Sequence, residues 1–179
     1  MESDMILDDD LQKGAGGTPV ELVDQNKFIL FYFLSLGLYG IWWMYKSWKF
    51  FQEKDKLDIW PAARAIFAIF FAYSLFDEIQ RYAQANGYQK SFSSGGMFAA
   101  FLLLNFSSRL PDPIGWLSLL AFLPLLPPLN ALNYAISHSE EYEGVFSSRL
   151  NNRQVVLVVL GVLFWALIII GLFFAEEGF

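Results

Sequence analysis

The stretch from Lys27 to Lys49, KFILFYFLSLGLYGIWWMYKSWK, most limits what this chain can fold into. From Phe28 to Tyr45 it carries no ionisable side chain except tyrosine phenols. At about 1.5 Å of rise per residue, a helix of that length just crosses ~27–30 Å of hydrocarbon. Its far end holds the aromatic and basic residues that anchor helices among lipid headgroups, which are Trp42, Trp43, Tyr45, Lys46, Trp48 and Lys49. The stretch therefore predicts a membrane protein.

The composition supports this prediction. Hydrophobic residues make up 55% of the chain and charged residues 17%, whereas soluble domains average ~45–50% and ~25%. The excess apolar surface must be covered, so the expected partners are the lipid bilayer and other membrane proteins, or a second copy of the chain. Lys and Arg are too few to predict nucleic-acid binding. The absence of cysteine excludes disulfides, thiolate nucleophiles and cysteine metal sites.

Five apolar segments predict an all-α membrane protein, a bundle of four to five transmembrane helices. The segments are residues 28–48, 61–77, 95–109, 114–136 and 155–175, which place one helical membrane domain at 27–176. An acidic, glycine-containing tail at 1–26 is expected to be disordered, and 177–179 form a short C-terminal tail.

Two of these segments leave alternatives open. Gly37 and Gly40 weaken a helix in the middle of the first segment, so a re-entrant hairpin is the alternative to a full span. The segment at 95–109 is short, which fits a tilted span, a buried helix or one half of a helical hairpin.

The fourth segment contains Pro124, Pro127 and Pro128 near its centre. Proline removes a backbone donor and clashes with the preceding turn, so this helix is predicted to break there. A broken helix persists in a membrane only against neighbouring helices or a water-filled cavity. The break is therefore the best pointer in the sequence to an interior site.

The predicted topology follows from the lysines of the loop at 46–60. Positive charge in a short loop favours the cytoplasmic side, so this loop is predicted to be cytoplasmic. A complete first span would then place the acidic N-terminus on the other side of the membrane.

Polar residues near or within the apolar segments form the candidate site: Asn105, Arg109, Asp112, Asn130 and Asn133. Polar groups at membrane depth need partners and often mark a function, so a cluster of these residues would suit a solute or a lipid headgroup. The interpretation that we favour is that the asparagines join helices by hydrogen bonds and that Arg109 pairs with Asp112 at a turn.

No catalytic, metal-binding or cofactor-binding pattern is present. The one histidine, His138, lies in a charged loop without an orienting carboxylate, so we expect it to be a solvated residue and not a catalytic base. Adjacent acidic pairs occur at 77–78, 140–141 and 176–177, but neighbours on a helix diverge by about 100° and share no face. The sequence therefore predicts no enzyme, no metal and no cofactor.

The run K-F-x-x-x-x-x-L-S-L-G-L-Y-G-x-W-W-x-Y-K-S-W resembles a bacterial family of small multi-pass membrane proteins known only as a domain of unknown function. Further parts of this resemblance are R-A-x-F-x-x-F from Arg64, R-L-P-D-P from Arg109, L-P-L-L from Leu123 and N-x-x-N from Asn130. It covers most of residues 27–135 and implies a helical protein of the bacterial inner membrane, without an activity or a site.

The expected function is that of a non-catalytic accessory or scaffold component of a bacterial membrane. The alternative is a small permease or channel component, or a lipid-binding membrane protein, with a polar site near the broken fourth helix. A wet cavity joining Asn105 to Asn130 would favour the alternative. A closely packed interior with an exposed apolar face would favour the scaffold.

Overall fold

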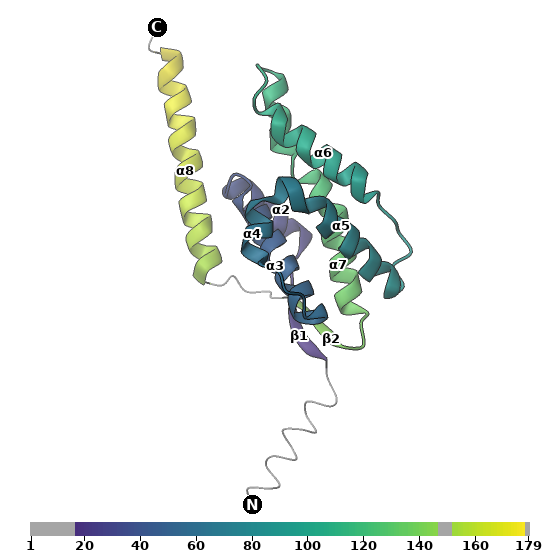
Figure 1. The fold of residues 1–179 in the computed structure, drawn as a ribbon. Helices are drawn as coiled ribbons and strands as arrows, with labels where there is room; N and C mark the ends of the chain where they lie inside the picture. The colour runs from purple at the N-terminus through teal and green to yellow at the C-terminus, as the bar shows by residue number, and fades with distance from the viewer. Residues whose placement is uncertain (1–16, 147–151, 178–179) are drawn as a thin grey trace, which may run out of the picture.

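The computed structural model describes residues 17–146 and 152–177, and this part of the chain is mostly helical. The predicted helical class is confirmed, with one small sheet added (Figure 1). Its elements in chain order are β1 (Thr18–Leu22), α2 (Gln25–Leu34), α3 (Leu38–Asp55), α4 (Pro61–Ile66), α5 (Ala68–Ala85), α6 (Ser94–Ser107), the 3-10 helices η1 (Ile114–Leu120) and η2 (Leu123–Leu125), α7 (Leu126–Ser137), β2 (Tyr142–Phe146) and α8 (Asn152–Glu177). Residues 1–16 and 178–179 of the predicted tails lie outside the described residues.

The sheet corrects one prediction. Strand β1 pairs in parallel with β2, with Thr18 opposite Tyr142 and Leu22 opposite Phe146, although β1 lies inside the segment 1–26 that was expected to be disordered. Leu22 is buried and belongs to the core. The composition around β1 gave no sign of a strand because the backbone partner that completes its hydrogen bonds is far along the chain.

The first apolar segment is not one helix, because the chain reverses between α2 and α3. Leu36 and Gly37 have φ angles of 52° and 89°, and the Ser35 hydroxyl accepts a hydrogen bond from the Tyr39 amide at 2.8 Å. The Phe28 ring, near the start of α2, lies 5.8 Å from the Trp43 ring of α3. The predicted single span at 28–48 is therefore wrong. The chain forms a helical hairpin instead, which was the alternative suggested by Gly37 and Gly40.

The second apolar segment also bends. Helix α4 ends at Ile66 and α5 begins at Ala68, because Phe67 has a non-helical ψ of 41°. Ala65, Ala68 and Ala72 are buried, which lets α4 and α5 pack closely against α3. Helix α5 then continues to Ala85, beyond the predicted end of the segment.

The predicted proline break is confirmed. The fourth segment runs as the 3-10 helices η1 and η2 before regular helix begins at Leu126. Pro127 and Pro128 lie in the first turn of α7, where the missing amide donor costs no intrahelical hydrogen bond.

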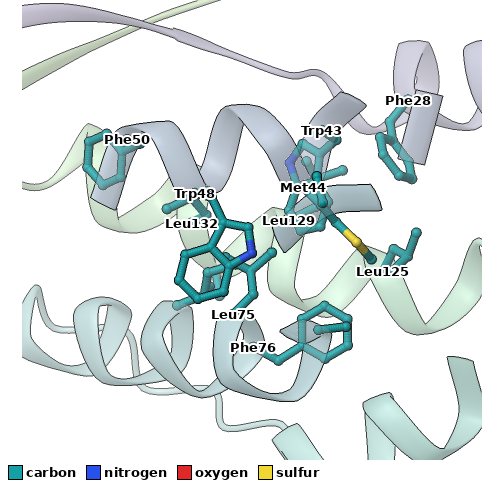
Figure 2. Close-up of a cluster of buried hydrophobic side chains, with 14 of the residues drawn as sticks. Phe28, Trp43, Met44, Trp48, Phe50, Leu75, Phe76, Leu125, Leu129 and Leu132 are labelled. Atoms are coloured by element: carbon teal, nitrogen blue, oxygen red, sulfur yellow. The ribbon is translucent and has the colours of Figure 1, made fainter. Parts of the chain in front are cut away.

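The core lies where α3, α5 and α7 meet, with α2 across one side. Figure 2 shows side chains from α3, α5, η2 and α7 pointing into it, including Trp43, Met44, Trp48, Leu75, Phe76, Leu125, Leu129 and Leu132. Two buried polar side chains at its edge are satisfied. The Ser47 hydroxyl donates to the Trp43 carbonyl at 3.0 Å, and the Gln80 side-chain oxygen accepts from the Phe92 amide at 3.2 Å. This interior is therefore apolar and closed.

Two helical stretches of the described chain are long and apolar enough to cross a membrane, at residues 114–137 and 154–171. In an 18-residue apolar window of the first stretch, 39% of the residues are buried within the protein, and in the second stretch only 6%. The third predicted span appears as α6, which has 14 residues. A bundle of four to five spans is thus not supported, because the first two segments fold into shorter helices.

Candidate functional site

The two asparagines that follow the proline break form hydrogen bonds with residues at the start of α2 and just before it. Asn130 donates from Nδ2 to the Gln25 side-chain oxygen at 2.8 Å, and Asn133 donates from Nδ2 to the Val23 carbonyl at 2.8 Å. Residues 23 and 24 connect β1 to α2, and Gln25 is the first residue of α2. The asparagines of α7 therefore act as structural links between distant parts of the chain.

The other three candidate residues lie at a different place. Asn105 donates from Nδ2 to the Phe101 carbonyl of its own helix at 2.8 Å. Arg109 and Asp112 are exposed in the turn between α6 and η1, and no ion pair joins them. The structure therefore does not gather the five predicted polar residues into one cluster.

The cavities near these residues are also separate. Asn105 lines a groove of about 270 Å³ whose other walls are the α2–α3 turn, the start of α5 and the C-terminal half of α6. Asn130 lines a different, open depression beside the loop that precedes α6. These two cavities have no lining residue in common.

The predicted headgroup anchors divide between two faces of α3. Trp42, Lys46 and Lys49 are exposed, and the Lys46 ammonium lies 5.7 Å from the centre of the Trp42 ring. These three positions share a helical face because they are four and three residues apart. Tyr45 is half-buried.

Trp43 and Trp48 were wrongly predicted as anchors, since each is only 2% exposed. They lie on the face of α3 that packs into the core, where Trp43 contacts Phe28. The Trp48 ring is covered by the Arg64 guanidinium at 4.5 Å, and Arg64 also lies 5.3 Å from the Phe71 ring. Arg64 is thus held between two rings by cation–π contacts.

A polar groove of about 220 Å³ runs between β1 and the exposed face of α3. Lys46 and Lys49 lie on one wall with Glu53, and Glu21 of β1 lies on the other. Lys49 forms an ion pair of 3.4 Å with Glu53. The groove therefore holds charges of both signs.

Near this groove, Lys54 of α3 meets two tyrosines, Tyr82 and Tyr142. Its ammonium lies 5.0 Å from the centre of the Tyr82 ring and is hydrogen-bonded to Asp55. Partial burial works to lower the pKa of Lys54, but the bond to Asp55 and the nearby acidic groups raise it on balance. Burial raises the pKa of Tyr82 and, together with Glu141, that of Tyr142. All three groups keep their usual charge at neutral pH, so none is prepared to act as a base.

His138 has the surroundings of a structural residue. Its ring is exposed and stacks on the Tyr134 ring, with centroids 3.8 Å apart, and Nδ1 lies 2.9 Å from the Tyr134 carbonyl oxygen. The Ser139 hydroxyl donates to the Ile136 carbonyl and is not directed at the histidine. Within the described ranges, no group of three or more His, Cys, Asp or Glu residues is arranged to hold a metal ion.

Sequence reasoning missed the most unusual surface of the protein, which we call the apolar end. It consists of the turns at residues 35–38 and 66–70 and the second half of α6, residues 101–107, and all three line the groove that contains Asn105. Its large side chains are exposed, including Leu36 (55%), Leu38 (66%), Ile66 (68%), Phe70 (72%) and Leu103 (72%). The signal for the first of these turns was Gly37 within an uncharged segment.

The polar end lies opposite and consists of β1, β2 and the C-terminal turns of α3, α5 and α7. Figure 1 shows the two strands at one end of the protein and the turn after α6 at the other. Phe50 of α3 contacts both Tyr142 of β2, at 5.1 Å, and Tyr82 of α5, at 5.5 Å. The Tyr134 hydroxyl of α7 donates to the Gly87 carbonyl just after α5, at 3.4 Å.

Comparisons with protein-family models, with curated proteins and with solved structures found no match to this chain. The functional argument therefore depends on the geometry described above.

Proposed function

We propose that this chain is an integral membrane protein that serves as a non-catalytic accessory or scaffold component, and the observation that carries the proposal is the surface of α8. Residues 154–171 contain no charged side chain, and 6% of them are buried within the protein. A helix that is apolar on all sides needs lipid or another helix around it.

The attachment of α8 to the rest of the chain is narrow. Trp165 donates from Nε1 to the Phe33 carbonyl at 3.0 Å, and Gly161 approaches Leu34 so closely that a β-carbon there would lie 2.7 Å from the Leu34 carbonyl oxygen. Other positions of α8 are exposed, such as Leu160 (61%) and Leu167 (68%). This uncovered surface is available to a helix of another membrane protein.

The polar residues favour this proposal over the permease alternative. Asn130 and Asn133 are used in links within the fold, and Asn105 bonds to its own helix. A solute path would need these groups along one cavity, whereas they line separate ones. The location in a bacterial inner membrane is part of the same proposal.

Two measurements test the proposal. Retention of the chain in membranes after washing with alkaline carbonate tests whether it is integral, and recovery in the wash would contradict it. A photoreactive side chain at Leu167 of α8, with Leu103 of α6 as a control of similar exposure, then tests the accessory role. We expect a discrete protein adduct from position 167 that position 103 does not give. Lipid adducts alone at both positions, or solute flux through vesicles containing only this chain, would count against it.

A further inference from the structure

Each of the two helical pairs that precede α6 contains one helix too short to cross a bilayer. Helix α2 has 10 residues and α4 has 6, which correspond to about 15 Å and 9 Å of helix. The hydrocarbon core is ~30 Å thick, so α2 reaches about half of that depth. Each pair reverses direction where the short helix ends.

Both ends of the α2–α3 pair lie at the polar end. Strand β1 leads into α2, and Asn133 holds Val23 at that point. On α3, Phe50 contacts Tyr142, the residue that pairs with Thr18 at the start of β1. The chain therefore enters and leaves this pair beside the same sheet.

The α4–α5 pair returns to the same end. Helix α4 is held against α3 where Arg64 covers the Trp48 ring. At the far end of α5, Tyr82 contacts Phe50 at 5.5 Å and lies 5.0 Å from the Lys54 ammonium.

Several backbone amides in both turns donate to carbonyls within the protein. In the first turn, the amides of Leu36, Gly37 and Leu38 donate to the carbonyls of Phe33, Tyr32 and Ser35 at 2.8–3.2 Å. In the second, the Phe67 amide donates to the Ala63 carbonyl at 2.9 Å and the Phe70 amide donates to the Phe67 carbonyl at 2.9 Å. Irregular backbone in hydrocarbon requires such internal hydrogen bonds.

The side chains of the turns suit acyl chains. No Asp, Glu, Lys or Arg occurs at residues 28–45 or 65–76. Leu38 and Phe70 are 66% and 72% exposed, and both turns border the groove at the apolar end. Apolar patches of this kind mark membrane or protein contacts and are unusual on a surface in water.

The lysines of α3 give the depth of insertion. Lys46 and Lys49 follow Gly37 by nine and twelve residues, which places them about 14 Å and 18 Å along the helix from the turn. One leaflet contributes about 15 Å of hydrocarbon, so both ammonium groups would reach the headgroups while the turn lies near the bilayer centre. Trp42, on the same exposed face, follows Gly37 by five residues and lies about 8 Å along the helix, between the turn and Lys46.

We propose that α2–α3 and α4–α5 are re-entrant pairs that enter one leaflet from the side of the polar end and turn back within it, with acyl chains covering residues 35–38 and 66–70. The N-terminal segment, the loop at 56–60 and the loop at 86–93 then all lie on one side of the membrane. This arrangement replaces the topology in which a complete first span separates the N-terminus from the lysine-rich loop.

The chain contains no cysteine, so single cysteines can report the side directly. Thr18→Cys, Asp58→Cys and Lys90→Cys each replace an exposed residue outside the apolar segments, and Leu38→Cys lies in the first turn. The four variants are labelled with a membrane-impermeant maleimide in intact cells and in inverted membrane vesicles. A lipid-soluble maleimide serves as the control for the reactivity of Leu38→Cys.

We expect the first three variants to label in the same preparation and from the same side. Leu38→Cys is expected to lose labelling by the impermeant reagent in both preparations while reacting with the lipid-soluble one. Labelling of Thr18→Cys and Asp58→Cys from opposite sides would overturn the proposal for α2–α3, and opposite sides for Asp58→Cys and Lys90→Cys would overturn it for α4–α5. Either result leaves the membrane assignment intact, because that assignment fails only if the chain leaves the membrane fraction.

Discussion

The substitution Gly37→Ala separates the two descriptions of the first apolar segment because they predict effects of opposite sign. In a continuous helix over 28–48, alanine would stabilise the fold by about 1 kcal/mol relative to glycine. In the structure, Gly37 has a φ of 89°, and an added β-carbon would lie 3.3 Å from the Tyr32 ring. A side chain in the left-handed region costs roughly 1–2 kcal/mol, so the structure predicts a loss of stability.

This loss is measurable as a change in the thermal midpoint in mild detergent, followed by circular dichroism. For a chain of this size, 1 kcal/mol corresponds to about 2–4 °C, so Gly37→Ala is expected to lower the midpoint by about 2–8 °C. Two further variants serve as controls.

Gly87 also has a positive φ, of 85°, but a β-carbon there would meet only the Tyr134 hydroxyl at 4.0 Å. Gly87→Ala therefore measures the cost of the backbone conformation without a steric contact. Gly171 lies within α8 with nothing within 4 Å, so Gly171→Ala is expected to leave the midpoint unchanged or raise it. A Gly37→Ala variant as stable as the Gly171→Ala variant would refute the turn.

Three further predictions concern single side chains. Arg64→Gln is expected to lose about 1–2 kcal/mol of unfolding free energy, because the cation–π contact with the Trp48 ring is partly buried, and Arg64→Lys should lose less; detergent unfolding curves check this order. Asn133→Ala should lower the unfolding free energy by about 1–3 kcal/mol, because it leaves the Val23 carbonyl without its partner. Asn105→Ala should change the unfolding free energy little, because its hydrogen bond lies within its own helix. Equal losses in the same assay would contradict the role of Asn133 as a link between distant parts of the chain. Trp165→Phe removes one hydrogen bond between α8 and α2, so it should lower the unfolding free energy in detergent by about 0.5–1.5 kcal/mol, with an unchanged free energy as the contrary result.

The helical class and the break in the fourth segment could be predicted from the sequence because both depend on local chemistry. Uncharged apolar runs favour helix wherever water is excluded, and prolines end helices in any environment. The structural role that we favoured for the asparagines is confirmed for Asn130 and Asn133, but their partners could not be predicted. Nothing near Asn133 in the sequence indicates that its partner is the Val23 carbonyl.

The anchors of α3 show the same limit. Trp42 and Trp43 are neighbours with the same chemistry, yet one is 37% exposed and the other 2%. A helix turns by about 100° per residue, so adjacent side chains meet different surroundings, and only the packing of α2 against α3 selects which face is covered. The residue types and their place at the end of an apolar run assigned both tryptophans to the membrane interface.

The sequence by itself determined that this chain is helical and apolar and that its fourth segment breaks at the prolines. The tertiary structure decided where the chain turns back, because the reversal at Gly37 is held by the contact of Phe28 with Trp43, and the β1–β2 sheet joins segments from opposite ends of the chain. An apolar run of sufficient length is compatible with one span or with two shorter helices packed together. Contacts between residues distant in sequence distinguish these folds, and a local pattern does not contain them.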